Sequence, residues 1–306
     1  MNALFRILLS SIFLVQLTHL ANAKPKRNRW SFKVDLPMDI LATQASLDEL
    51  KEDIRSKLND LEAVVNKRCE AKTMMEKEIV RFTSENPKAD HMYGSLSGDL
   101  MKSTKGLIVI QENLGMTNEI TDRALKIAKL GNLVTLAVDL YRGDIAQTHD
   151  EARELSGMLS YDGAMKDIEG AAMYLKSRGI KKVGITGFCF GGRITLSAAA
   201  LINPDLISAA APFYGIPDPE MCGCNISNIA VPVQAHFGMN DTSRSANPVE
   251  AEKLRILLEN IGDKNEFFFY DNAGHAFNRV DGDRYNKDAD ELSLKRLVDF
   301  MNKHLM

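Results

Sequence analysis

Cys189 lies at the centre of the sequence Gly187-Phe188-Cys189-Phe190-Gly191-Gly192, which joins two segments of different hydrophobic pattern. The apolar run 183–186 predicts a short buried strand, and the run 193–202 predicts a helix. Glycines two residues before and two after the cysteine suit a sharp strand-to-helix turn, because a side chain there would collide with the strand or the helix. Such a turn presents the sulfur at a helix N-terminus, where a thiolate is favoured and can act as a nucleophile.

Taken alone, this turn allows two other interpretations. Glycine-rich strand-to-helix turns also bind phosphate groups through their backbone N–H groups. A buried cysteine is also often only a small hydrophobic residue of the core. A nucleophilic cysteine therefore needs an acid and a base elsewhere in the chain.

Two further segments supply an acid and a base. The sequence 236–241 predicts a strand and then a loop that carries Asp241, and the sequence 271–277 predicts a strand end and then a loop that carries His275. Both residues follow a strand, which is where open parallel sheets build their sites. The chain order of nucleophile, acid and base, together with the glycine-flanked turn, is typical of the α/β-hydrolase fold.

The segments around these residues alternate between apolar strands and helices. We predict strands at 107–111, 133–138, 183–186, 209–213, 231–237 and 267–270, and helices at 119–130, 193–202, 248–261 and 287–304, with further helical patterns between 150 and 178. Continuous apolar strands that alternate with helices are typical of a mostly parallel sheet covered by helices on both faces.

The first 23 residues have the pattern of a signal peptide. One positive charge precedes an apolar run at 7–15, and Ala21-Asn22-Ala23 is a small-x-small cleavage site. We predict cleavage after Ala23 and export to a periplasm or out of the cell. An uncleaved anchor is disfavoured because the apolar run is shorter than the ~20 residues of a membrane span. No other segment approaches a transmembrane helix, so no stable membrane span is expected after cleavage.

Residues 24–88 are predicted to form a helical N-terminal extension. Between about 39 and 83 the sequence is charged and almost free of glycine and proline, with apolar residues three and four apart from 47 to 65. This helix is expected to pack on the body of the protein; the alternative is self-association as a coiled coil, although the heptad fails at Lys57 and Arg68. We place the boundary near 84–88, with the α/β domain at 89–306.

Charge and cysteine content limit the partners and cofactors. The net charge of −3 over 306 residues and the scattered basic residues give a nucleic acid little to bind. If Cys189 is a working thiol, a bridge from Cys69 to either Cys222 or Cys224 is expected after export, because a Cys222–Cys224 bond would close a tight ring. No nearby histidine or cysteine completes a zinc site with that Cys-Gly-Cys, so neither a metal nor another cofactor is expected.

Together these segments resemble the dienelactone hydrolase family, in which a cysteine replaces the usual serine. The residues that carry the resemblance are Gln111-Glu112, Asp139-Leu140-Tyr141, the Cys189 turn, Phe213-Tyr214-Gly215, Asp241 and Gly274-His275-Ala276-Phe277. The resemblance covers residues 90–306 and implies hydrolysis of small carboxylic esters or lactones through a thioester intermediate, as in a carboxymethylenebutenolidase. Residues 30–88 lie outside it.

The resemblance also implies roles for single residues. Cys189 attacks a carbonyl carbon, His275 transfers the proton, and Asp241 orients the imidazole and stabilises its positive form. Backbone N–H groups of Asn113 and Phe190 form an oxyanion hole. Glu112 governs the protonation of the thiol before the substrate arrives; the alternative for a lone glutamate after a strand is a solvated loop charge.

Substrate choice depends on a second set of residues. Arg279 corresponds to an arginine that holds a substrate carboxylate, which implies a small anionic ester or lactone. A second such arginine is expected at 147–153, where the ungapped position is His149 and Arg153 fits only with a shift; this departure favours a general carboxylic ester hydrolase over a dienelactone hydrolase. Tyr141 and Tyr214 are expected to be pocket walls, or else ordinary core aromatics.

Two alternatives to a hydrolase remain at this stage. One is a catalytically silent hydrolase fold whose helical extension binds a partner protein. The other is a redox sensor that pairs Cys189 with another thiol.

Overall fold

The computed structural model describes residues 51–60, 77–88 and 91–306, and the chain forms two units that divide between Val65 and Asn66. In the first unit, residues 51–60 are helical, as predicted for this part of the extension. Ion pairs one helical turn apart join Arg55 to Glu52 and Lys57 to Asp53, both at 2.8 Å. The predicted signal peptide and Cys69 lie outside the described residues.

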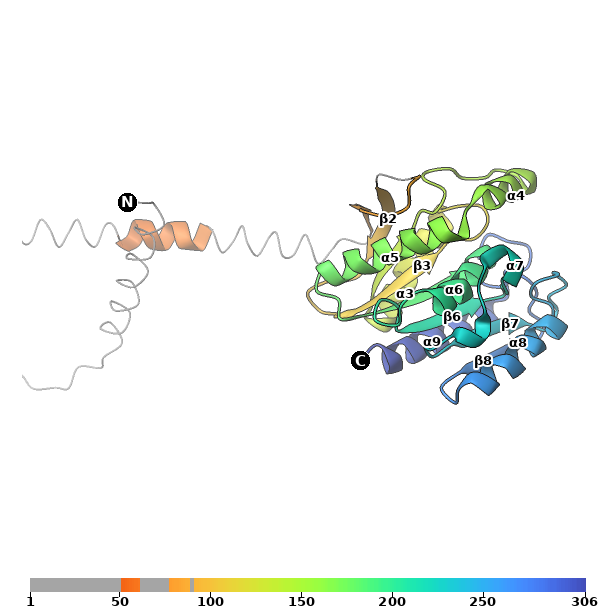
Figure 1. The fold of residues 1–306 in the computed structure, drawn as a ribbon. Coiled ribbons are helices and arrows are strands. Elements are labelled where there is room, and N and C mark those ends of the chain that lie inside the picture. Colours follow the sequence, from red (N-terminus) through yellow and green to blue (C-terminus); the bar gives the residue numbers. More distant parts are fainter. Residues whose placement is uncertain (1–50, 61–76, 89–90) are drawn as a thin grey trace, which may run out of the picture. The chain divides into compact units, whose positions relative to one another are not determined.

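The second unit is built on an eight-stranded sheet with the order β1-β2-β4-β3-β5-β6-β7-β8 (Figure 1). Its strands are β1 Glu78–Phe82, β2 Met92–Ser97, β3 Lys105–Ile110, β4 Val134–Val138, β5 Lys182–Phe188, β6 Ala209–Phe213, β7 Gln234–Gly238 and β8 Glu266–Tyr270. Strand β2 pairs antiparallel with β1 and β4, and all other neighbours are parallel. Strands β3 to β8 therefore end at one edge of the sheet.

Helices cover both faces of this sheet. They are α3 Asn118–Gly131, α4 His149–Met158, α5 Tyr161–Ser177, α6 Phe190–Leu201, α7 Pro219–Cys222, the 3₁₀ helix η1 Ile226–Asn228, α8 Pro248–Ile261 and α9 Lys287–His304. In Figure 1, α5 and α6 lie in contact on the near face, and α3 and α9 lie in contact behind the sheet. The expected α/β-hydrolase fold, a mostly parallel sheet between two helical layers, is confirmed.

Side-chain caps explain where several of these helices begin. The Asn247 side chain accepts hydrogen bonds from the N–H groups of Val249 and Glu250, and Pro248 occupies the first turn of α8, where a missing N–H costs nothing. Asn286 caps α9 in the same way through the N–H of Ala289. These two helices have the predicted bounds, because both start signals are local in sequence.

Strands β1 and β2 correct the sequence-based prediction. Residues 78–82 were expected to continue a helix to Thr83, but they pair with 92–97 at the edge of the sheet. The alternation in β1 buries Val80 and Phe82 and leaves Ile79 and Arg81 outside, which is a strand period rather than a helical one. The sheet therefore begins before residue 89, and only residues 51–60 of the expected helix are helical among those described.

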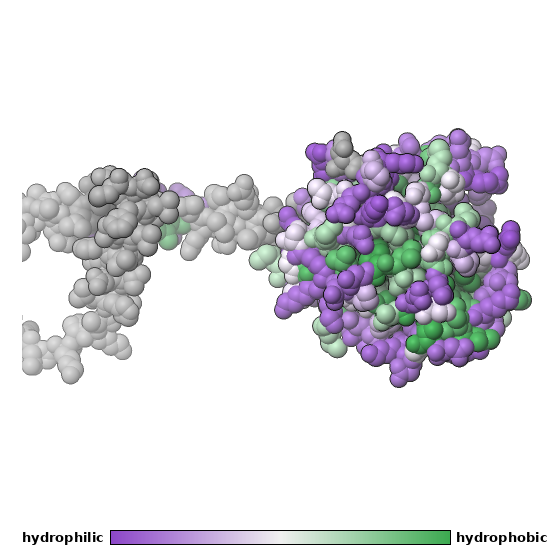
Figure 2. Space-filling view, viewed as in Figure 1, coloured by the Kyte–Doolittle hydropathy of each residue, from purple (hydrophilic) through white to green (hydrophobic). Residues whose placement is uncertain are grey.

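The surface of this unit is mixed in character. Figure 2 shows mainly hydrophilic residues with smaller hydrophobic areas on the face in view. Helix α8 exposes Val249 and Ile256. None of the helices that the structure describes is both long and apolar enough to cross a membrane.

Candidate active site

Cys189 occupies a strained turn between β5 and α6. It has φ 55° and ψ −111°, a backbone conformation that costs free energy in a residue other than glycine and that clusters at functional sites. The Cys189 N–H donates to the Phe213 carbonyl at 3.1 Å. A Cβ added to Gly187 would lie 2.3 Å from the Gly191 oxygen, and one added to Gly191 would lie 2.6 Å from the Gln111 oxygen. The glycines are therefore required by close backbone contacts, as predicted from their spacing.

The structure brings Cys189, His275 and Asp241 together. His275 Nε2 lies 3.0 Å from Cys189 Sγ, and His275 Nδ1 lies 2.7 Å from Asp241 Oδ2. Cys189 is half-buried, whereas Asp241 is 2% exposed. Three residues that are far apart in the sequence thus form one hydrogen-bonded chain, because each follows a strand that ends at the same edge of the sheet.

The electrostatics of this chain favour a positively charged imidazole. Burial by itself lowers the pKa of His275, but its contacts with Asp241 and with Cys189 outweigh burial and raise that pKa to about 10. Burial also tends to raise the pKa of Asp241, yet the hydrogen bonds from His275 and Ser243 hold it below its usual range. The arrangement can therefore keep a proton on His275 beside the sulfur.

Ser243 belongs to this cluster and was not singled out in the sequence. Its N–H donates to Asp241 Oδ1 at 2.8 Å, and its Oγ lies 3.3 Å from His275 Nδ1. An aspartate often bonds the N–H two residues ahead of it, so the Asp-x-Ser spacing was an available signal. Ser243 fixes the orientation of the carboxylate that faces the imidazole.

Glu112 is buried just after β3. The cation close to it is Arg123, which was not predicted from the sequence. Arg123 Nη1 on α3 lies 3.6 Å from Glu112 Oε1. Arg123 also donates to Glu119 and, at 2.9 Å, to the carbonyl of Asn278, and its guanidinium lies 4.2 Å from the centre of the Phe188 ring. The spacing of Glu119 and Arg123 is that of an exposed helical ion pair, so their burial could not be predicted from the sequence.

The two tyrosines expected to be pocket walls, Tyr214 and Tyr141, lie near the hydrogen-bonded group of Cys189, His275 and Asp241. Tyr214 is fully buried, and its ring meets that of His275 edge-on at 5.2 Å. The Tyr141 ring centre lies 6.0 Å from that of Phe190, the residue after Cys189. Tyr214 therefore contacts His275 of the site, and Tyr141 contacts Phe190, the neighbour of Cys189.

The two residues expected to donate backbone N–H groups occupy suitable elements. Phe190 is the first residue of α6, and the first N–H groups of a helix have no partner within it. Asn113 lies in the loop after β3. Because β3 and β5 are parallel neighbours, these two segments follow strands that end side by side.

The two expected arginines differ in their surroundings. Arg279 lies in the loop after His275, and its Nε donates to Asp281 at 2.9 Å. Arg153 lies on α4 with 81% of its side chain exposed, and it pairs with Asp150 at 3.1 Å. The structure does not bring Arg153 to the group formed by Cys189, His275 and Asp241.

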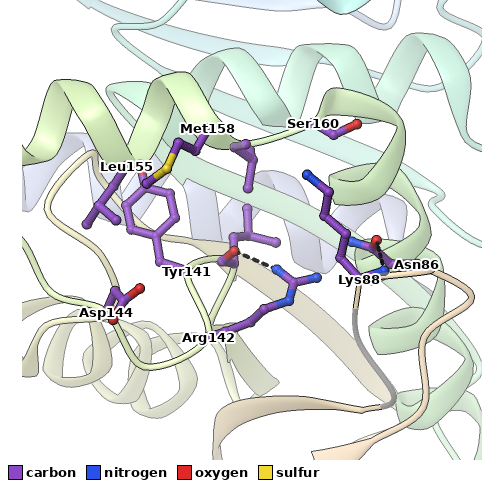
Figure 3. A pocket seen from close by; sticks show the side chains of 10 residues that line it. Asn86, Lys88, Tyr141, Arg142, Asp144, Leu155, Met158 and Ser160 are labelled. Atoms are coloured by element: carbon purple, nitrogen blue, oxygen red, sulfur yellow. Dashed lines mark hydrogen bonds between the residues drawn. The ribbon is translucent and has the colours of Figure 1, made fainter.

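A cavity of about 290 Å³ lies beside Tyr141 (Figure 3). Tyr141, Leu155 and Met158 line one side of it, and Lys88 and Arg142 extend toward it from the other. Tyr141 lines this cavity and also packs on Phe190, the residue after Cys189. Its lining combines an apolar wall with Lys88, Asp144 and Arg142, and the Arg142 guanidinium is paired with Asp167 at 2.9 Å.

The disulfide corrects a further prediction. Cys222 is bonded to Cys224, so neither is joined to Cys69. Gly223 between them has φ 60°, and this left-handed turn at the end of α7 brings the two Cα atoms to 5.1 Å, within the usual range for a disulfide. Cys189 is the free cysteine in the described part of the chain, where no group of three or more histidine, cysteine or acidic side chains could hold a metal ion.

The fold and this constellation define an α/β-hydrolase, and comparisons with known proteins give its family. Residues 95–305 match the model of the dienelactone hydrolase family. A protein of Yersinia pestis named "Putative carboxymethylenebutenolidase" is 31% identical over 213 residues, which cover 65% of this chain and 78% of that protein. Protein usf of Aquifex pyrophilus is 35% identical over 184 residues, 56% of this chain and 76% of its own length. The chain belongs to the dienelactone hydrolase family, which confirms the resemblance and the expected ester or lactone hydrolase.

Solved structures agree with this assignment at the level of the fold. The "Putative Dienelactone Hydrolase" of Klebsiella pneumoniae has a TM-score of 0.62 and 24% identity, over 73% of this chain and 98% of its own. A dienelactone hydrolase-like promiscuous phosphotriesterase, P91 from metagenomic libraries, has a TM-score of 0.61 and 20% identity, over 74% of this chain and 98% of its own.

Proposed function

We propose that this protein hydrolyses small carboxylic esters or lactones with Cys189 as the nucleophile, through a thioester acyl-enzyme. The observation that carries the proposal is the hydrogen-bonded chain from Cys189 Sγ through His275 to Asp241, at 3.0 and 2.7 Å. A nucleophile, a base and an orienting acid within hydrogen-bond reach are the arrangement that covalent acyl transfer requires. The strained backbone of Cys189 supports a functional turn.

The proposed reaction has two steps. The thiolate adds to the carbonyl carbon, and the bond to the leaving alkoxide breaks as His275 Nε2 donates its proton to that oxygen. A water molecule then adds to the thioester while His275 accepts its proton, and the carbon–sulfur bond breaks to release the acid. Backbone N–H groups of Asn113 and Phe190 would stabilise the oxyanion in both steps, each by about 3 kcal/mol.

Trapping the acyl-enzyme tests the proposal. Acid quenching during turnover of a p-nitrophenyl ester should leave the acyl group on the peptide that contains Cys189, and neutral hydroxylamine should remove it, as expected for a thioester. Digestion and mass spectrometry measure both. The Cys222→Ala/Cys224→Ala protein is the control, because it keeps the proposed nucleophile and should be acylated equally. An acyl group found elsewhere, or none under conditions of measured turnover, would contradict the mechanism.

We further propose that the substrate is anionic and that Arg279 contacts its carboxylate. Arg279→Ala should raise KM about tenfold for an ester with a free carboxylate on its acyl side, because a charge-assisted hydrogen bond is lost. KM for a neutral ester of the same length should not change. The comparison is made with the mono-p-nitrophenyl ester of glutaric acid and the p-nitrophenyl ester of pentanoic acid, which both have a five-carbon acyl chain.

Arg153→Ala is the matched control for this prediction. Arg153 pairs with Asp150 on the exposed face of α4, so its removal should alter neither KM. An equal effect of Arg279→Ala on both esters would remove the support for an anionic substrate, and an effect of Arg153→Ala on the carboxylate ester would assign the contact to that arginine instead.

We also propose that the protein acts after export. The signal-peptide pattern of residues 1–23 and the bonded pair Cys222 and Cys224 support an oxidising compartment. The mass of the mature protein tests this, since cleavage after Ala23 leaves Lys24 at the N-terminus, and retention of residues 1–23 on exported protein would contradict it.

A further inference from the structure

Glu112 and Arg123 are two buried charged groups that lie close together without a hydrogen bond. Glu112 is 5% exposed and Arg123 is 4% exposed. Their nearest charged atoms, Oε1 and Nη1, are 3.6 Å apart, and neither atom has a hydrogen-bond partner among the described residues. Buried polar atoms are usually bonded, so two unpaired atoms that face each other call for an explanation.

The position of Arg123 is fixed from several sides. It donates to the carbonyl of Asn278, three residues after His275, and its guanidinium lies over the ring of Phe188, which precedes Cys189. Glu119, one turn earlier on α3, accepts a further hydrogen bond from it. Arg123 is therefore tied to the two segments that carry the proposed nucleophile and base.

Glu112 is in turn close to the Cys189 turn. A Cβ on Gly191 would lie 2.6 Å from the carbonyl oxygen of Gln111, so the first turn of α6 packs against the backbone that leads into Glu112. The fully buried Tyr214, whose ring contacts His275, interacts electrostatically with both Glu112 and Cys189. Glu112 therefore follows directly on the backbone that packs against the Cys189 turn.

Arg123 is the cation best placed to balance that carboxylate. The titratable or charged groups that act on Glu112 from the surrounding elements are Arg123 and Glu119 on α3, Tyr214 after β6 and Arg279 in the loop after β8. Of the two arginines, Arg279 is paired with Asp281 at 2.9 Å and has 31% of its side chain exposed. The charge of Arg279 is therefore partly screened by solvent, whereas Arg123, which also pairs with Glu119, is buried with Nη1 3.6 Å from Glu112.

We propose that Arg123 is a positioning residue that holds the Glu112 carboxylate beside the proposed nucleophile, a role that rests on the proposed function. A direct bidentate bond would engage both carboxylate oxygens. At 3.6 Å the guanidinium still attracts the carboxylate, but Oε1 remains able to accept a hydrogen bond from the thiol or from a substrate hydroxyl. Arg123 acts on the reaction only through Glu112.

A double-mutant cycle tests this dependence. The four proteins are wild type, Glu112→Gln, Arg123→Met and the double variant, and kcat/KM is measured with a neutral p-nitrophenyl ester. Glu112→Gln should lower kcat/KM about tenfold in the wild-type background and less than about twofold in the Arg123→Met background, which is a coupling typical of residues that act together. Arg123→Lys, which keeps the charge, should restore part of the dependence on Glu112.

Arg279→Met provides the matched control. Glu112→Gln should lower kcat/KM by the same factor of about ten with and without Arg279, because Arg279 is paired with Asp281. The proposal is overturned if Glu112→Gln has the same effect with and without Arg123, or if Arg279 rather than Arg123 shows the coupling. Thermal unfolding of each variant distinguishes a structural role of Arg123 from a positioning role. If Arg123→Met lowers Tm but the effect of Glu112→Gln on kcat/KM stays the same, Arg123 does not position Glu112.

A second readout keeps this test independent of turnover. The rate at which iodoacetamide alkylates Cys189 is measured from pH 5 to 9 in the same proteins. Glu112→Gln should change the pH profile in the wild-type background and should not change it once Arg123 is methionine. If Glu112→Gln changed the pH profile equally in both backgrounds, the positioning role of Arg123 would be contradicted. Because alkylation needs no ester hydrolysis, this result is distinguishable from a failure of the proposed hydrolase function.

Discussion

Replacing Cys189 by alanine is expected to lower kcat for a p-nitrophenyl ester by about 10⁴-fold or more, since loss of a nucleophile in a cooperating triad costs nearly all of its contribution. The sulfur is the group that His275 Nε2 faces at 3.0 Å, and no other free cysteine lies in the described residues. The backbone strain at this position remains with alanine, so the turn and its oxyanion donors should keep their places. Initial-rate kinetics at saturating ester measure the loss.

The control for this prediction is a protein that lacks the other described cysteines. Cys222→Ala/Cys224→Ala should keep kcat within about threefold of wild type, because the buried disulfide at the end of α7 is not part of the group of Cys189, His275 and Asp241, and its loss should lower Tm instead. Circular dichroism and Tm establish that each variant is folded. If the wild type hydrolysed the ester no faster than Cys189→Ala does, the protein would be a catalytically silent hydrolase fold. This is the alternative in which the helical extension binds a partner protein.

The residues of the proposed reaction could be predicted because each follows a strand. In a parallel sheet the strands that carry Cys189, Asp241 and His275 end at one edge, so their order along the chain was enough to place them together. The bounds of α8 and α9 were also predictable, since Asn247, Pro248 and Asn286 act within a few residues of the helix start. Local signals and a simple topology account for these successes.

Other features depend on contacts between distant segments. Residues 78–82 contain charged side chains that suit a helix, and only pairing with 92–97 makes them a strand. Arg123 has the spacing of a surface ion pair with Glu119, and its burial follows from the packing of α3 against the loop after β8. The bond from Cys222 to Cys224 depends on the left-handed conformation of Gly223. None of these could be inferred from spacing alone.

Asp241 is the residue whose conservative replacement should be most damaging. Asp241→Asn is expected to lower kcat by about 10⁴-fold, as the same change does in a serine protease triad. An asparagine amide donates to His275 Nδ1, so the ring must carry its hydrogen on Nε2, where it can no longer accept a proton from the thiol. The loss of the carboxylate also removes one of the contacts that raise the pKa of His275 to about 10.

The matching measurement is the titration of His275 by NMR in wild type and in Asp241→Asn. The pKa should fall in the variant toward 6.5, the ordinary histidine value, because a hydrogen bond and an opposite charge have been removed. Ser243→Ala is the control: it loses the Oγ contacts with His275 and Asp241 but keeps the N–H that orients Asp241, so kcat should fall less than about tenfold. If the pKa of His275 falls but kcat does not, Asp241 sets the charge of the imidazole without being needed for catalysis. If neither changes, the 2.7 Å contact between Asp241 and His275 is not part of the reaction.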